Sequence, residues 1–219
     1  MTPDCQPGAR LRNVDGERNG ERNRERDGEN GAELGAIVLT GGSAVRIQGA
    51  DKAGIEVAGV TLLERALTTL AEIPEVVVVG EQGPTSRPVT FLREDPPGGG
   101  PAAGLLAGLS GFPRPPHLVV VLAVDMPMVT AATVRRLMLS CEGDGALLVD
   151  GTGRRQYLCA IYRSEALLAA APPLEEQHGL PVRRLVGDLR LIEVPALAAE
   201  AQDLDTWDDL VTLRTLLGD

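Results

Sequence analysis

Short apolar runs alternate with helical patterns along most of this sequence, and this alternation constrains its fold more than any other feature. Runs rich in valine and isoleucine, expected to be strands, span residues 36–39, 76–79, 89–92, 118–124, 146–149, 158–162 and 191–194. Apolar residues at helical spacing occupy several of the intervals, namely 62–71, 130–139, 165–171 and 206–217. Alternating strands and helices predict an α/β fold with three layers, in which a mostly parallel, Rossmann-like sheet is joined by right-handed crossovers.

The composition is compatible with one folded domain that follows an N-terminal tail. Of the 219 residues, 43% are hydrophobic but only 2% are aromatic, so Val, Leu and Ala must supply the packing of the core. Residues 17–28 have almost no apolar side chain and mix both charge signs, so burial cannot offset the entropy lost on ordering them. We expect a disordered, charged tail over residues 1–33 and a single domain over residues 34–219.

Charge and hydropathy exclude several classes of partner. A net charge of −10 at pH 7 disfavours nonspecific nucleic-acid binding and attraction to an anionic membrane surface. No apolar stretch approaches the length of a transmembrane helix, and the N-terminus lacks the apolar core of a secretory signal. The cysteines, Cys5, Cys141 and Cys159, have no metal-ligand spacing. We therefore expect a cytoplasmic protein with reduced thiols, and no nucleic acid or membrane as a partner.

A glycine-rich loop follows the first predicted strand and predicts a polyphosphate site. The candidate nucleotide-binding residues in it are Leu39, Thr40, Gly41 and Gly42. Glycine N–H groups can approach an anion without obstruction by a Cβ atom, and Arg46 and Lys52 follow closely as cations. The loop is neither a P-loop nor the Gly-x-Gly-x-x-Gly dinucleotide fingerprint. It therefore indicates a third kind of nucleotide site, at the strand end where α/β sheets bind ligands.

Carboxylates in two segments are candidates for a metal site. Asp125 follows a fully apolar strand, where it could hold Mg²⁺, a hard cation that shares oxygen ligands with substrate phosphates. A turn or helix N-cap is the alternative role for an aspartate beside a proline. Asp203 or Asp205 could complete the metal shell from a late acidic segment. Asp208 and Asp209 fit the acidic start of a helix better.

Two further segments could contact a nucleotide or an acceptor. Asp95 precedes a Gly/Pro loop over residues 96–101 and a helix of small residues, so it could bind a base, a ribose or an acceptor. The glycines of this loop could instead only form turns. Arg183 and Arg184 form a second cationic pair that a phosphorylated acceptor could use, although solvated helix arginines are the alternative.

Five segments, in this order, resemble the motifs of the molybdenum cofactor guanylyltransferases and the wider MobA-like nucleotidyltransferases. They are Leu39-Thr40-Gly41-Gly42 with Arg46-Ile47-Gln48 and Gly49-Ala50-Asp51-Lys52; Asp95 with Gly98-Gly99-Gly100-Pro101 and Gly104; Val124-Asp125-Met126-Pro127; Gln156-Tyr157-Leu158-Cys159-Ala160-Ile161-Tyr162-Arg163; and Asp203-Leu204-Asp205-Thr206. Thr40 stands where the family has alanine, and Gln48 stands where it has glycine. If that position requires positive φ, Gln48 costs about 1 kcal/mol.

The resemblance implies a Mg²⁺-dependent nucleotidyltransferase that transfers GMP from GTP to molybdopterin and releases pyrophosphate. It implies catalytic roles for Arg46 and Lys52 at the triphosphate and for Asp125 at Mg²⁺. Lys52 and Asp125 thereby also join the nucleotide-binding residues, and Asp95 helps to place the nucleotide or the acceptor. Transient contact with enzymes or chaperones of the molybdenum cofactor is also implied.

Other functions remain open at this point. A cytidylyltransferase, or another MobA-like NTP transferase with a different acceptor, would have the same motifs. A nucleotide-binding regulator without catalysis is the alternative from another class. In the reaction that the resemblance implies, the acceptor phosphate attacks directly and no side-chain nucleophile is needed. His117 and His178 are therefore expected to be bystanders.

Overall fold

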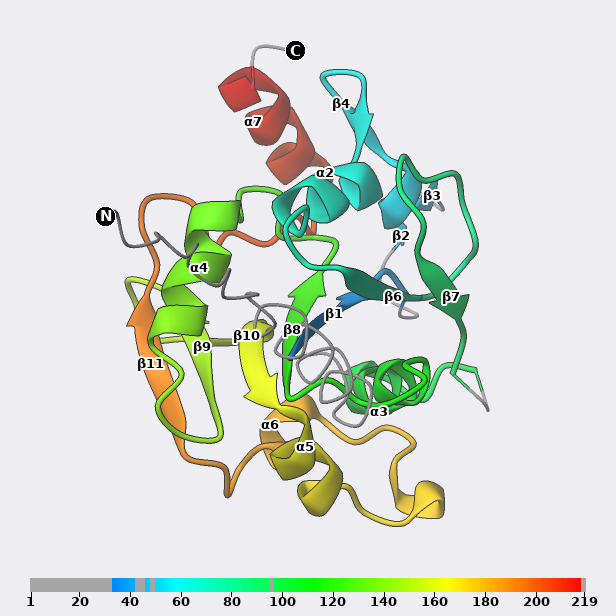
Figure 1. The fold of residues 1–219 in the computed structure, drawn as a ribbon. Helices are drawn as coiled ribbons and strands as arrows, with labels where there is room; N and C mark the ends of the chain where they lie inside the picture. Colours follow the sequence, from blue (N-terminus) through cyan, green and yellow to red (C-terminus); the bar gives the residue numbers. More distant parts are fainter. Residues whose placement is uncertain (1–32, 42–45, 48–49, 95–96, 218–219) are drawn as a thin grey trace, which may run out of the picture. The chain divides into compact units, whose positions relative to one another are not determined.

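Seven strands form the central sheet in the computed structural model, which describes residues 33–41, 46–47, 50–94 and 97–217 (Figure 1). They are β1 (Leu34–Leu39), β6 (Glu75–Val79), β7 (Thr90–Leu92), β8 (Leu118–Ala123), β9 (Gly145–Val149), β10 (Arg155–Arg163) and β11 (Leu191–Pro195). Their order across the sheet is β11-β9-β10-β8-β1-β6-β7. Every run that the sequence pattern predicts as a strand is therefore a strand of this sheet.

The sheet is mostly parallel, as predicted, with one antiparallel strand. β1 pairs in parallel with β6 and β8, β6 with β7, and β9 with β11. β10 is antiparallel to both β8 and β9. Only the turn over residues 150–154 joins β9 to β10, and a parallel pair needs a much longer crossover. The strand pattern alone does not reveal this reversal.

Helices cover both faces of the sheet and complete the predicted three layers. The helices on one face are α2 (Leu62–Thr69), α4 (Ala131–Leu139) and α7 (Trp207–Leu217), and those on the other are α3 (Pro101–Ser110), α5 (Ser164–Ala170) and α6 (Val182–Leu185) (Figure 1). Successive strand residues point to opposite faces and so divide the core into two clusters. Val38 and Leu122 belong to the first cluster, and Ile37 and Val121 to the second.

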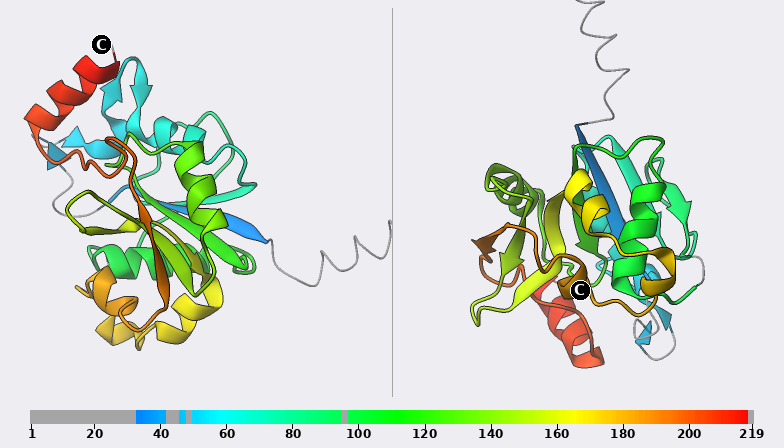
Figure 2. Two further views of the ribbon diagram at one scale, coloured as in Figure 1. Left: turned by 90° about the vertical axis from the view of Figure 1, so that its left-hand side faces the viewer. Right: turned by 90° about the horizontal axis from the view of Figure 1, so that it is seen from below.

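Several short elements were not predicted. They are the strand pairs β2 (Arg46–Ile47) with β3 (Ala50–Asp51) and β4 (Glu56–Val57) with β5 (Val60–Thr61), and the 3₁₀ helices η1 (Lys52–Gly54) and η2 (Leu174–Glu176). α7 lies beside the β4–β5 hairpin, where the guanidinium of Arg214 donates to the carbonyl of Glu56 at 3.3 Å (Figure 2). These pieces are too short for hydrophobic periodicity to show them.

The N-terminal prediction cannot be compared with the fold, because residues 1–32 lie outside the described part of the chain. A disordered tail over residues 1–33 stays a prediction. The described residues, from 33 onwards, form one unit by their mutual contacts. Among the described residues, no helix has the length and apolar character needed to cross a bilayer.

Candidate active site

The carboxyl ends of β1 and β8 lie side by side and carry the two most informative segments of the sequence. The two strands are parallel neighbours, with Leu39 opposite Ala123. Beyond the strands, the N–H of Val124 still donates to the carbonyl of Leu39 at 3.0 Å. The glycine-rich loop and Asp125 therefore leave the sheet next to each other.

Lys52 is buried beside two carboxylates. It begins η1, and only 2% of its side chain is exposed. Its Nζ lies 2.9 Å from Oδ1 of Asp205 and 3.5 Å from Oδ2 of Asp125. Burying an ammonium group is costly unless anions pair with it, and here two aspartates do so. Residues from three distant segments of the chain thus meet at one point.

Asp125 is a half-buried carboxylate among other charges. Burial raises its pKa, the positive charge of Lys52 opposes that rise, and the negative charge of Asp205 adds to it. The N–H of Leu204 donates to the carbonyl of Asp125 at 2.8 Å and so holds the late acidic segment against this loop. A cation at Asp125 would relieve the repulsion between these carboxylates.

Asp203 and Asp205, the two candidates to complete a metal site with Asp125, form ion pairs with different cations. Asp203 is 18% exposed, and its Oδ2 lies 3.2 Å from Nη2 of Arg154. Burial and the negative charge of Asp125 raise the pKa of Asp203, whereas Arg154 lowers it. Asp205 is 67% exposed and pairs with Lys52. Asp203 and Asp205 thus both lie in the charge environment of Asp125, and each has its own cation.

Within the described part of the chain, no three His, Cys, Asp or Glu side chains are grouped so that they could hold a metal by themselves. This does not conflict with Mg²⁺, which is commonly bound by one or two carboxylates and by substrate phosphates. Cys141 and Cys159 are free thiols, and burial raises the pKa of Cys159 to about 12. The donors at this edge of the sheet are therefore carboxylate oxygens, not thiolates.

A groove of about 790 Å³ lies along this edge of the sheet, which is the size of a small-molecule site. Its lining includes Asp125, Asp203 and Asp205, the arginines Arg154, Arg155 and Arg183, and Pro101 at the start of α3. Gln156, Tyr157 and Leu158 also line it, next to the place where the β9–β10 ladder shifts register between Gln156 and Ala160. Such bulges commonly redirect side chains at the edges of sites.

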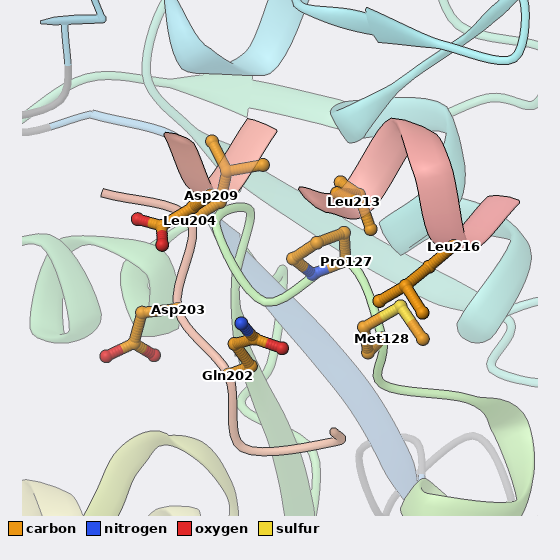
Figure 3. A pocket seen from close by; sticks show the side chains of 8 residues that line it. All are labelled: Pro127, Met128, Gln202, Asp203, Leu204, Asp209, Leu213 and Leu216. Carbon is orange, nitrogen blue, oxygen red and sulfur yellow. The ribbon is translucent and has the colours of Figure 1, made fainter. Parts of the chain in front are cut away.

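A second hollow, behind the acidic segment, is too small for a substrate (Figure 3). It has a volume of about 10 Å³, and its lining residues are Pro127, Met128, Gln202, Asp203, Leu204, Asp209, Leu213 and Leu216. The carboxylate of Asp203 points away from Leu213 and Leu216 (Figure 3). The hollow is therefore a packing gap between α7 and the loop after β8.

Thr40 uses its polar groups within the sheet. Its hydroxyl and its N–H both donate to the carbonyl of Val79, at 3.2 and 3.0 Å. The side chain is buried against Gly80. Gly41 is exposed and is therefore the first residue of the loop that is open to a ligand.

Some predicted site residues cannot be placed. Gly42, Gln48 and Asp95 lie outside the described residues. The backbone of Arg46 pairs with that of Asp51 in the β2–β3 hairpin, but the Arg46 side chain is outside the described part. Their roles stay predictions.

The remaining predicted residues lie as follows. Arg183 is exposed on α6 and lines the groove, as the prediction of a second cationic pair allows. His117 precedes β8 at its amino end, where its Nε2 lies 2.7 Å from Nη1 of Arg163. That position is at the far end of β8 from Asp125, so His117 has no place in this site.

Sequence reasoning missed Arg154. The residue closes a turn in which Oδ1 of Asp150 accepts from the N–H groups of Thr152 and Arg154, at 2.8 and 2.9 Å. The turn that carries it could have been predicted, because Asp-Gly-Thr-Gly between two apolar runs is a turn sequence. It would also have predicted a hairpin and hence the reversal of β10.

Residues 36–194 match the MobA-like NTP transferase domain family. A protein of Opitutus terrae named "probable molybdenum cofactor guanylyltransferase" is 36% identical over 143 residues, which are 63% of this chain and 70% of that protein. The crystal structure of molybdopterin-guanine dinucleotide biosynthesis protein A from Archaeoglobus fulgidus superposes with a TM-score of 0.65 at 20% identity, covering 84% of this chain and 98% of that one. The structure of 2-C-methyl-D-erythritol 4-phosphate cytidylyltransferase from Thermus thermophilus gives 0.64, also at 20% identity, with the same coverage. The two structures share the fold of this chain.

Proposed function

Because the chain belongs to the MobA-like NTP transferase family and is therefore a nucleotidyltransferase, we propose that it transfers GMP from GTP to molybdopterin. The observation that supports a transfer site most strongly is the meeting of Lys52, Asp125 and Asp205 at the edge of a substrate-sized groove. The choice of GTP and molybdopterin is supported by the name of the Opitutus relative. A cytoplasmic location, and delivery of the product through transient contacts with cofactor enzymes or chaperones, are part of this proposal.

The triphosphate is the ligand that we assign to Lys52, together with Arg46 and the backbone from Leu39 to Gly42. Lys52 begins η1, and its ammonium pairs with Asp125 and Asp205, which line the groove. On binding, a phosphate oxygen would take the place of the Asp205 carboxylate as its partner. A lysine acts here as a point charge, whereas an arginine offers a planar fork. Asp95 remains our candidate for placing the base or the acceptor.

A divalent metal ion is in general use among NTP transferases of this family. The donors present here fit Mg²⁺, since they are oxygens and since the charge of Asp125 is crowded by Asp205 and Asp203. We assign its binding to Asp125 with either Asp203 or Asp205. When bound, such an ion neutralises negative charge on the phosphate oxygens.

The chemistry requires positioning more than it requires a reactive side chain. An oxygen of the acceptor phosphate forms a bond to the α-phosphorus of GTP. The bond from that phosphorus to the oxygen bridging the α- and β-phosphates breaks, and pyrophosphate leaves with its electron pair. A dianionic acceptor phosphate needs no base. The contribution of this chain is therefore to hold two anions in line and to offset their charge.

Turnover with each NTP and molybdenum-loaded molybdopterin, followed as pyrophosphate release, tests the assignment. We expect product with GTP alone. A preference for CTP would replace the proposal with a cytidylyltransferase. Absence of pyrophosphate with every NTP and with any phosphorylated acceptor would favour a nucleotide-binding regulator.

Asp125→Asn tests the metal assignment separately. The substitution keeps the shape of the side chain but removes its charge, so we expect turnover to fall by about 100-fold or more, as for the loss of other transition-state contacts. Asp208→Asn, at an exposed position in the first turn of α7, is the matched control and should keep full activity. Normal turnover by Asp125→Asn would show that the ion is held elsewhere.

A further inference from the structure

A second cation, besides Lys52, stands next to the carboxylates of the site. Arg154 lines the groove, and its Nη2 lies 3.2 Å from Oδ2 of Asp203. The described charges therefore alternate, with Arg154 paired to Asp203 and Lys52 paired to Asp125 and Asp205. If Lys52 serves the triphosphate, Arg154 is left for another anion.

The turn that carries Arg154 is held by several hydrogen bonds, whereas the Arg154 side chain is largely exposed. Oδ1 of Asp150 accepts from the N–H and the hydroxyl of Thr152 and from the N–H of Arg154, at 2.7–2.9 Å. The N–H of Asp150 donates back to the carbonyl of Arg154 at 3.0 Å, and Gly153 adopts a φ of +87° that favours glycine. The Arg154 side chain is 66% exposed. Its guanidinium can therefore exchange partners without a change in the fold.

The other arginines of the groove are placed differently. Arg155 is held by Glu193 of β11, with its Nε and Nη2 at 2.7 and 2.5 Å from Oε1. Arg183 stands on α6, and among the described residues it has no ion pair with the carboxylates of the site. Arg154 is paired with Asp203, whose charge interacts with that of Asp125. It is thus the groove arginine linked to the point where the two substrates must meet.

We propose that Arg154 binds the phosphate of the acceptor, an inference that rests on the proposed function. The acceptor phosphate must approach a polyphosphate in a site that already holds three carboxylates, so it needs a cation of its own. A guanidinium matches two phosphate oxygens at once. Asp203 holds the guanidinium in the groove until the acceptor phosphate competes for it. The phosphate oxygen that is not engaged is then free to attack the α-phosphorus of the NTP.

Binding of molybdopterin and of its dephosphorylated form, measured by equilibrium dialysis with the full chain, tests this role. The wild-type protein should bind the phosphorylated form at least about 10-fold more tightly. Arg154→Gln should abolish that discrimination, and should leave the affinity for GTP within about twofold. Arg155→Gln is the matched control: it removes a neighbouring arginine whose guanidinium is engaged by Glu193, and it should keep the discrimination.

The outcomes separate this inference from the proposed function. If the wild-type protein guanylylates molybdopterin and Arg154→Gln still discriminates, the assignment of Arg154 is wrong while the proposed function stands. If the wild-type protein does not use molybdopterin, the proposed function is wrong, and inorganic phosphate becomes the probe. Weaker phosphate binding by Arg154→Gln than by Arg155→Gln then supports the anion site, and equal binding overturns it. Unchanged thermal unfolding of both variants excludes a folding defect, as expected for arginine side chains that are exposed.

Discussion

At the scale of single residues, Thr40 and Gly80 hold the start of the glycine-rich loop against the sheet. Both polar groups of Thr40 donate to the carbonyl of Val79, and its side chain fills the space over Gly80. A Cβ atom on Gly80 would lie 1.9 Å from Oγ1 of Thr40. Gly80 also has a φ of +150°, which side chains rarely adopt. The threonine at this position thus requires the glycine opposite it.

We expect Gly80→Ala to destabilise the protein by about 2–3 kcal/mol, because it adds both a clash and backbone strain. Thr40→Ala alone should cost about 1 kcal/mol, from one lost hydrogen bond. Urea unfolding of the two single variants and the double variant forms a double-mutant cycle. The double variant should be more stable than the sum of the two losses predicts, since the clash is gone. Strict additivity would mean that the two side chains do not meet.

At the scale of elements, a carboxylate fixes the segment that carries Asp203 and Asp205. Glu200 accepts four hydrogen bonds: from the hydroxyl of Thr133 at 2.6 Å, from Nη1 and Nη2 of Arg136 at 2.9 and 2.7 Å, and from the N–H of Leu197 at 2.8 Å. The first three donors are on α4. The segment after β11 is thereby tied to a helix of the core three residues before the site begins.

Glu200→Gln should lower the free energy of unfolding by about 2 kcal/mol at pH 7. Burial alone would raise the pKa of Glu200, but the bonds from Arg136, Thr133 and the backbone lower it from 4.5 to about 2. Because the pKa of the folded state is the lower one, this stabilisation is complete above about pH 5 and is lost as the pH falls towards 2. Urea unfolding at several pH values should show the wild-type and variant curves converging in acid.

Glu193→Gln provides the comparison for an exposed pair. Glu193 and Arg155 are each about half exposed, so their contact is screened by water and should contribute less than about 1 kcal/mol. If Glu193→Gln lowered the free energy of unfolding as much as Glu200→Gln does, the stabilisation could not be assigned to the hydrogen bonds that Glu200 accepts.

At the scale of the whole molecule, the strands were predictable because most of them are buried apolar runs that end at turn residues. The direction of β10 does not follow from the composition of the strand itself. The short Asp-Gly-Thr-Gly turn before the strand indicates a hairpin and hence the reversal. The meeting of Lys52 and Asp125 could be predicted, since their segments follow strands whose carboxyl ends share one edge of a parallel sheet. The place of Arg154 beside the site could not be predicted, because an arginine in a surface turn resembles any solvated side chain. Only its contact with Asp203 distinguishes it.

Removal of residues 1–31 should leave the fold and the turnover intact. Both core clusters and every described residue of the site lie in residues 33–217. We expect the midpoint of thermal unfolding of the shortened chain to stay within about 2 °C of the full one, which corresponds to less than about 1 kcal/mol for a domain of this size. A loss of several degrees, or of turnover, would show that the domain begins earlier than residue 34.

The reversal of β10 affects which part of this protein can change in sequence during evolution without loss of the fold. Because β9 runs to the ligand-binding edge and β10 returns from it, the turn over residues 150–154 forms part of the groove wall, while both of its ends are anchored in the sheet. Surface turns of this kind accept insertions and replacements with little effect on the core. If Arg154 binds the acceptor as we propose, a gene that changes only this turn could exchange one acceptor for another and leave Lys52 and Asp125 unaltered.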